Sequence, residues 1–128
     1  MTDSVNPVII KKYGNRRLYN TTTSAYEKLE SLAAMAKRGE VFVVYDAKSG
    51  DDITRSILQH IVAEEEKKSG QDLLPIAFMR RLIGFYGDAM QEMVPAYLEI
   101  SMETLTRERE KRQGVRRHVA ESSKSPGG

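Results

Sequence analysis

Residues 41–47, VFVVYDA, constrain the fold more than any other segment, because their apolar side chains fall on both faces of an extended chain. β-Branched and aromatic residues favour strands, and a strand that is apolar on both faces is typical of a buried position inside a sheet. Helical spacing of apolar residues predicts helices over 29–38 and from about Thr54, a candidate N-cap, to about Lys68. The sequence therefore predicts an α+β fold in which residues 41–47 form a central strand.

A hairpin is expected ahead of this strand. VIIKKY at 8–13 predicts the first strand, Gly14 and Asn15 form a typical turn pair, and RRLYN at 16–20 predicts the second strand. Tyr26 is expected in a short extended piece. The predicted N-terminal domain therefore combines a basic β-hairpin, a further strand and two helices.

The second half of the chain changes to helical periodicity. At ~100° per residue the apolar side chains from Ile76 to Val94 share one half of a helical wheel, and Pro75 suits the first turn of that helix. Pro95 is expected to kink or break the helix, and residues 96–113 predict a further helix. We expect these amphipathic helices to oligomerise.

These patterns divide the chain into four segments. They are a disordered start over 1–7, a compact domain over 8–69, a helical region over 70–113 and a disordered tail over 114–128. No segment approaches the ~20 apolar residues of a membrane helix, and the first residues lack the pattern of a signal peptide.

The composition excludes several kinds of site. The 128 residues include no cysteine and two histidines, which excludes disulfides and thiolate chemistry and makes a histidine metal site unexpected. No nucleotide-binding, metalloprotease or hydrolase motif occurs. Asp51 and Asp52 are expected to cap the following helix. We therefore predict that the chain is not an enzyme and uses no metal or cofactor.

Charge is distributed unevenly along the chain. Residues 1–19 carry a net charge of +3, residues 20–106 carry −5 and residues 107–128 carry +4. The four cations of the hairpin interleave with Tyr13 and Tyr19, and a two-stranded ribbon of this kind can enter the major groove of DNA. The alternative is a solvated hairpin whose lysines and arginines discourage edge pairing. A further polyanion contact through the basic C-terminal residues is the weaker interpretation.

The apolar arc of the second half has two interpretations. It can form the core of an oligomer, or part of it can bind a hydrophobic ligand, because methionine makes adaptable contacts with irregular partners. Both interpretations hold if other subunits and the ligand compete for the same apolar face of the helices. The candidate residues are Ile76, Phe78, Met79, Leu82, Ile83, Phe85, Tyr86, Met90, Met93 and Tyr97.

At KKYGNRRLYN and VYDAKSGDDITRSIL the chain resembles the polyhydroxyalkanoate synthesis repressor family, also called polyhydroxyalkanoate or polyhydroxybutyrate accumulation regulators. LPIAFMRRLIGFYGDAMQEMVPAYLEISME similarly resembles the family's accumulation-regulatory region, so the resemblance spans about residues 8–105. It implies a bacterial transcriptional repressor that binds operator DNA through the 8–69 domain. Its targets would be the gene for phasin, the granule-coating protein, and its own gene, and binding of the polymer would release it from DNA.

The resemblance also assigns residues. The family's basic, DNA-binding signature falls on Lys11, Lys12, Tyr13, Asn15, Arg16, Arg17 and Tyr19. Its second signature, interpreted as a turn and a helix start, falls on Asp46, Gly50, Asp52, Thr54 and Arg55. Lys28 stands where relatives tend to place a Ser or Thr cap, which puts the start of the helix at 29–38 in doubt.

Two other functions are consistent with the sequence. One is a phasin-like protein that binds the granule surface without specific DNA binding, and the other is an adaptor that binds a protein through the apolar helices. The expected location is the bacterial cytoplasm, on DNA or at a storage granule. The expected partners are operator DNA, polyhydroxyalkanoate and further copies of the chain, as a dimer or tetramer.

Overall fold

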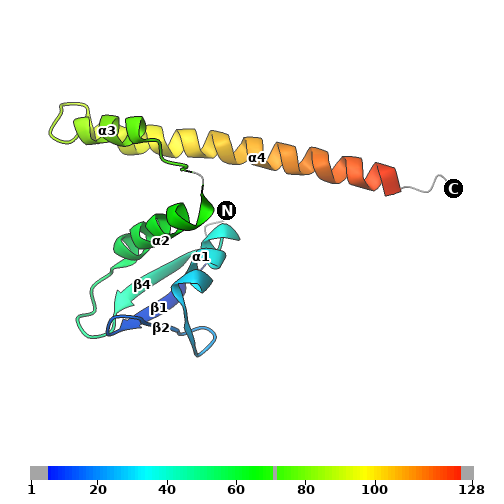
Figure 1. Cartoon of the computed structure of the whole chain (residues 1–128). Helices are drawn as coiled ribbons and strands as arrows, with labels where there is room; N and C mark the ends of the chain where they lie inside the picture. Colours follow the sequence, from blue (N-terminus) through cyan, green and yellow to red (C-terminus); the bar gives the residue numbers. More distant parts are fainter. Residues whose placement is uncertain (1–5, 71, 125–128) are drawn as a thin grey trace. The chain divides into compact units, whose positions relative to one another are not determined.

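The computed structural model describes residues 6–70 and 72–124, which divide into two compact units after Leu73 (Figure 1). Each unit is described by itself. The first contains β1 (Val8–Tyr13), β2 (Arg17–Asn20), β3 (Ala25–Glu27), α1 (Leu29–Lys37), β4 (Phe42–Asp46) and α2 (Thr54–Ser69). The second contains α3 (Ile76–Gly84), the 3₁₀ helix η2 (Gln91–Met93) and α4 (Val94–Lys124). The predicted α+β fold class is confirmed.

The strands form one sheet in the order β3-β2-β1-β4. β1 and β2 form the predicted antiparallel hairpin, in which Tyr13 pairs with Arg17 across a three-residue turn that begins at Gly14. Gly14 has a φ of 66°, a left-handed conformation that glycine adopts without a steric penalty. β4 runs parallel to β1, and the chain makes the required crossover through α1.

The prediction that residues 41–47 form a central strand is wrong, because β4 lies at the edge of the sheet. Its outer backbone groups are nevertheless bonded by the segment that follows it. The Asp46 N–H donates to the Asp51 carbonyl, and the Ile53 N–H donates to the Val44 carbonyl, each at 2.8 Å. This returning segment occupies the position of a further strand, which explains why the apolar pattern resembles that of an interior strand.

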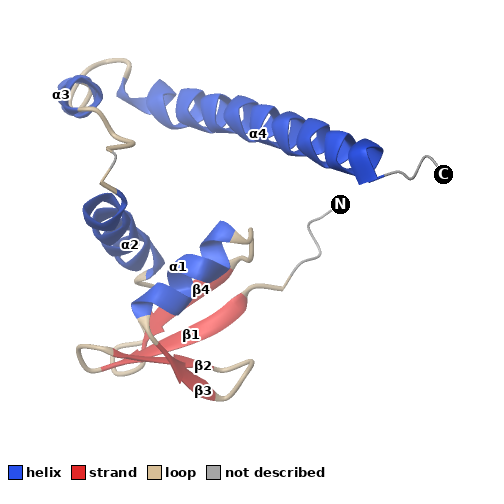
Figure 2. Cartoon of the chain, turned by 45° about the vertical axis from the view of Figure 1, so that its right-hand side comes forward, coloured by secondary structure: helices blue, strands red, loops and turns tan. Residues whose placement is uncertain are grey.

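Helices α1 and α2 cover one face of the sheet, as Figure 2 shows. Ile10, Leu32 and Val44 are fully buried at the centre of this contact. The core also includes residues from β2, both helices and β4, which are Leu18, Ala33, Met35, Phe42, Ile57 and Ile61. The apolar face of each helix thus closes over one side of the sheet and leaves the other side without a helix.

Both helices begin where the sequence predicts, and only the N-cap of the second differs. α1 begins at Leu29, with Lys28 as its N-cap and no side-chain capping bond, so the missing Ser or Thr does not move the start. α2 begins at Thr54, and its N-cap is Ile53. The Thr54 N–H donates to Asp52 Oδ1 at 2.9 Å, so Asp52 takes the capping role predicted for it.

The second unit departs further from the prediction. One helix was expected to continue from Ile76 to Val94, but α3 ends at Gly84, and a turn follows in which Gly87 has a φ of 84°. Gln91 Oε1 accepts the Gly87 N–H at 2.6 Å, which closes this turn. Pro95 lies in the first turn of α4, where a missing N–H leaves no bond unmade, so it starts a helix there.

The C-terminal helix is longer than expected. α4 continues past Gly114, the predicted start of a disordered tail, as far as Lys124. The remaining residues of that tail, 125–128, lie outside the described residues, as do residues 1–5 of the predicted disordered start. Within the described ranges, no helix combines the length and apolar character needed to cross a bilayer.

Candidate nucleic-acid interface

The strand register sorts the hairpin side chains onto two faces of the sheet. Successive residues of a strand point to opposite faces, so Ile10 and Leu18, which are buried in the core, fix the face that the helices cover. Their neighbours in sequence, and the residues paired with those neighbours across the strands, lie on the other side. We call this side the open face; it consists of Ile9, Lys11, Tyr13, Arg17, Tyr19, Tyr26, Val43 and Tyr45.

Three tyrosines form a ladder across the open face. The rings of Tyr13 and Tyr19 have centroids 6.5 Å apart, and those of Tyr19 and Tyr26 are 5.2 Å apart, both in edge-to-face geometry. The Arg17 guanidinium carbon lies 4.7 Å from the Tyr26 ring centroid, within the range of a cation–π interaction. The ladder therefore links β1, β2 and β3 and orders a cation on an otherwise exposed surface.

The open face brings together most of the residues predicted to bind DNA. Lys11, Tyr13, Arg17 and Tyr19 lie on it. Asn15 and Arg16 are exposed in the adjoining hairpin turn.

Lys12 is separated from this group. Its register with Asp46 of β4 places it on the covered face, where it is partly buried.

Two tyrosines of the open face were not predicted as site residues. Tyr26 was expected only in a short extended piece, and Tyr45 only within a strand. Tyr26 pairs with Tyr19, and Tyr45 pairs with Lys11. A two-residue alternation of aromatic and basic residues was visible within the two hairpin strands, but only the pairing with β3 and β4 brings Tyr26 and Tyr45 beside the cations.

Acidic side chains of the strands point away from the open face. Glu27 and Asp46 lie on the covered face by register. Asp46 Oδ1 accepts the Lys48 and Ser49 N–H groups, which lowers the pKa of Asp46. Asp52 lies beside Tyr45 at the β4 edge, and its hydrogen bonds with Thr54 lower its pKa. These carboxylates hold turns and a helix start, in agreement with the structural interpretation of the second signature.

The cations near the hairpin turn are not neutralised within the domain. No ion pair between described residues includes Lys11, Arg16 or Arg17. Because Glu27 and Asp46 lie on the covered face and Asp52 lies beyond the outer edge of β4, the hairpin end of the open face presents positive charge together with tyrosine hydroxyls. Such groups bind phosphates, and arginine also pairs with base edges.

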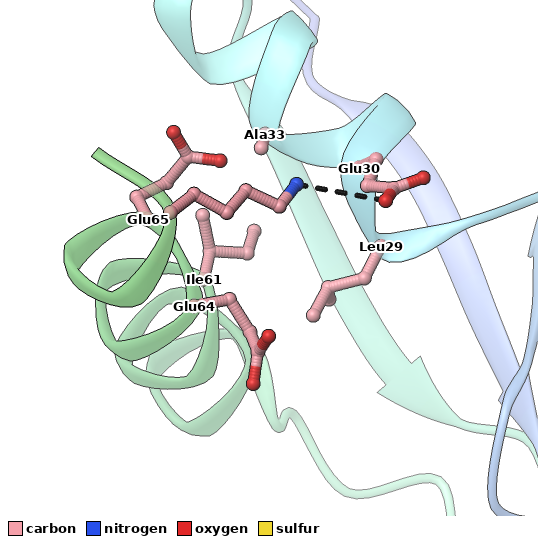
Figure 3. Close-up of a pocket in the computed structure, with 7 residues that line it drawn as sticks. Leu29, Glu30, Ala33, Ile61, Glu64 and Glu65 are labelled. Atoms are coloured by element: carbon pink, nitrogen blue, oxygen red, sulfur yellow. Dashed lines mark ion pairs between the residues drawn. The ribbon is translucent and has the colours of Figure 1, made fainter. Parts of the chain in front are cut away.

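The helix-covered side differs from the open face, because its acidic and basic side chains pair with one another. A small hollow between α1 and α2 is surrounded by the carboxylates of Glu30, Glu64 and Glu65, with Lys68 reaching Glu30 at 3.5 Å (Figure 3). An ion pair with Lys37 lowers the pKa of Glu65. Glu30, Glu64 and Glu65 are each ion-paired with a lysine, so this side presents mixed charge rather than a group of unpaired cations.

Comparison with known families assigns two segments of the chain to two domain families. Residues 9–69 match the PHB/PHA accumulation regulator DNA-binding domain, and residues 74–113 match the PHB accumulation regulatory domain. The chain belongs to the PHB/PHA accumulation regulator family. The open face of this regulator therefore lies within a DNA-binding domain.

Two relatives of the regulator match over 102 residues, or 80% of its chain. One is an uncharacterized protein of Allochromatium vinosum, 40% identical, of which the match covers 66%. The other, from Thiocystis violacea, bears the name "uncharacterized protein in phbA 5'region"; it is 39% identical, and the match covers 73% of it. The regulator thus spans about two-thirds of the length of these relatives. No solved structure matches it.

The regulatory domain carries all the residues predicted for polymer binding or oligomerisation, but not on one helix. They divide among α3, the turn after it, η2 and the start of α4. Leu82 is half-buried, whereas the other members of the set are exposed. Further exposed apolar side chains continue along α4 to Leu105. The regulatory domain therefore presents a large apolar surface.

Proposed function

We propose that this regulator is a transcriptional repressor of polyhydroxyalkanoate granule genes, namely the phasin gene and its own gene, and that polymer releases it from DNA. The observation that carries the proposal is the combination of two surfaces in one chain. The DNA-binding domain has a basic open face, and the regulatory domain has an exposed apolar surface. A regulator of storage genes has to detect the granule, and the polymer surface of a granule is apolar.

The residues predicted to bind DNA are Lys11, Lys12, Tyr13, Asn15, Arg16, Arg17 and Tyr19, and we propose that the members on the open face or in the hairpin turn make the contacts. The exposed turn residues Asn15 and Arg16 continue the open face beyond Tyr13 and Arg17. A hairpin end of this width suits the major groove, which admits a two-stranded ribbon. The regulator would act in the cytoplasm, without catalysis.

The apolar surface of the regulatory domain supports two roles. Soluble monomers rarely expose contiguous apolar patches of more than a few hundred Å², and side chains such as Ile83, Tyr97 and Leu105 are more than 60% exposed. We propose that copies of the chain cover this surface in a dimer or tetramer, and that polymer competes for part of it. Residues 8–69 and 70–113 are the proposed functional divisions.

Release from DNA requires that polymer discriminate between two arrangements of the oligomer. A ligand that binds both arrangements equally shifts nothing, however tightly it binds. In the proposed repressor, polymer favours an arrangement whose hairpins no longer match a two-fold operator.

The test is binding to a labelled fragment from upstream of a phasin gene, compared with a scrambled duplex at several salt concentrations. We expect selective binding with a log–log salt slope of about −2.7 or steeper, for the three basic contacts that Lys11, Arg16 and Arg17 offer in each hairpin. Adding amorphous polymer should release the fragment. Replacing Arg16 and Arg17 with alanine should weaken binding and leave the oligomer intact, and unchanged operator affinity would exclude the hairpin assignment.

The exposed apolar surface also favours a second candidate, a granule-surface protein. That function predicts adsorption to polymer and equal affinity for the phasin fragment and the scrambled duplex. The presence of a DNA-binding domain ahead of the helices argues against it, because coating a granule requires only amphipathic helices.

A further inference from the structure

We propose that the regulator contacts duplex DNA through the open face of its sheet, that Tyr26 is a positioning residue for Arg17, and that Lys12 stands outside the interface. This inference rests on the proposed binding of an operator duplex and specifies which side of the domain faces it. It predicts that the four cations of the hairpin are not equivalent, because they lie on different faces of the sheet and only one face contacts DNA.

The first argument is the position of Arg17. Its guanidinium lies 4.7 Å from the ring centroid of Tyr26, on the neighbouring strand β3. Stacking on a ring face restricts an arginine while leaving the N–H groups at its edge free to donate. Tyr26 is 53% exposed, so no core contact accounts for the ring position, and its ring packs against Arg17 and Tyr19.

The second argument is the separation of charge between the two faces. Lys11 and Arg17 share the open face with the tyrosine ladder. Glu27 and Asp46, the acids of the strands, lie on the other face by register. Asp52 pairs with Tyr45 and so shares the side of the open face, but it lies beyond β4, which is two strands away from the strand of Arg17. A phosphate backbone that approaches the hairpin end of the open face therefore meets cations first.

The third argument is the contrast between adjacent lysines. Lys11 is exposed on the open face, whereas Lys12 is partly buried opposite Asp46 on the covered face. The positive charge of Lys12 contributes to lowering the pKa of Asp46, so part of its field is already neutralised within the domain. The two residues are identical in chemistry and differ in the direction that they face, which makes them a matched pair.

Duplex DNA is favoured over single strands by the geometry of the rings. The tyrosines contact one another edge to face, at interplanar angles of 80° and 66°, so the ladder is not a set of coplanar platforms for successive bases. Hydroxyl groups and cations spread along two strands suit the phosphates that border a groove.

The experiment uses the full chain and a duplex that the wild-type protein enriches from a random-sequence pool. Affinity is measured by fluorescence anisotropy across a range of salt concentrations for the variants K11A, K12A, R17A, Y26A and Y26F. Circular dichroism and thermal unfolding confirm that each variant is folded.

We expect R17A to weaken binding by roughly five- to 150-fold, the range for loss of an arginine that contacts a base edge. K11A should reduce the magnitude of the salt slope by about 0.9 for one lost phosphate contact, while K12A should leave the slope unchanged. Y26A should reproduce part of the R17A loss, Y26F should retain binding, and the R17A/Y26A double variant should be no weaker than R17A. Such non-additivity identifies Tyr26 as acting through Arg17.

The open-face assignment is overturned if K12A weakens binding as much as K11A, or if Y26A and wild type bind equally. It is also overturned if the single strand of the selected sequence binds more tightly than its duplex, or if Y26A and R17A change the oligomer mass, which would make the face a subunit interface. If the wild-type protein enriches no sequence from the pool, the proposed repressor function itself fails.

Discussion

The backbone N–H of Val44 in β4 donates to Thr54 Oγ1 at 2.8 Å, so the first residue of α2 supplies a hydrogen bond that an edge strand would otherwise lack. Val44 is fully buried, which excludes water as a replacement partner. An unpaired buried N–H costs about 1–3 kcal/mol. The hydroxyl of Thr54 is therefore committed to joining helix and sheet.

Replacing Thr54 with valine, which keeps the shape and removes the acceptor, should lower the free energy of unfolding by about 1–3 kcal/mol. Thr54→Ser retains the oxygen and should lose much less. Urea unfolding followed by circular dichroism measures both. Equal stability of T54V and wild type would show that the Val44 N–H finds another acceptor.

The core at the centre of the sheet gives a second prediction. Ile10→Ala removes a fully buried side chain between the sheet and its helices, and should cost about 2–5 kcal/mol of unfolding free energy. Val41→Ala is the control, because Val41 lies just before β4 and is 56% exposed. If the two variants unfold at the same urea concentration, the described core is incorrect.

Acidification should destabilise the DNA-binding domain. The pKa values of Asp46 and Asp52 are lowered in the folded state, by hydrogen bonds from Lys48, Ser49 and Thr54. A carboxyl with a lowered folded pKa stabilises the fold above its unfolded pKa of about 3.9, and this stability is lost as pH falls through the folded pKa. We expect thermal stability to decrease as the pH falls below about 4.

Asp46→Asn isolates one of these groups. The amide oxygen that this substitution introduces can still accept both N–H bonds, but the amide carries no charge and does not titrate. The variant should therefore show a shallower loss of stability between about pH 5 and pH 2, in thermal unfolding followed at each pH. A pH dependence identical to that of wild type would mean that Asp46 does not contribute to the acid transition.

The extent to which sequence predicted this structure differs between its two halves. In the first half, two-residue alternation and the spacing around Gly39 and Gly70 predicted the strands and helices closely, because these patterns are local. The edge position of β4 was missed, since a returning segment rather than a strand bonds its outer side. In the second half, Gly84 and Gly87 end a helix whose apolar periodicity continues beyond them.

The candidate site was likewise predicted only in part, because local patterns do not show which residues meet across strands. The basic signature identified the hairpin, but the linear order of Lys11 and Lys12 conceals that they face opposite sides of the sheet. Tyr26 comes beside Arg17 only through the pairing of β2 with β3. Residues that meet across strands are specified by register, and register becomes visible only when the whole sheet is assembled.

The apolar surface of the regulatory domain gives the last prediction. Phe78 in α3 and Phe85 in the following turn are 38% and 39% exposed, so neither belongs to a closed core within the described part of their unit. If assembly or polymer buries them, each contributes about 1.5–3 kcal/mol through apolar area removed from water. The double variant F78S/F85S should then dissociate at concentrations roughly a hundredfold or more above those of wild type, or fail to release DNA when polymer is added. Sedimentation and the operator-release assay separate these outcomes. Arg80→Ser, an exposed polar position of the same helix, is the matched control and should change neither. If F78S/F85S assembles and responds to polymer like the control, the apolar surface that matters lies elsewhere, and the exposed side chains of α4 become the next to test.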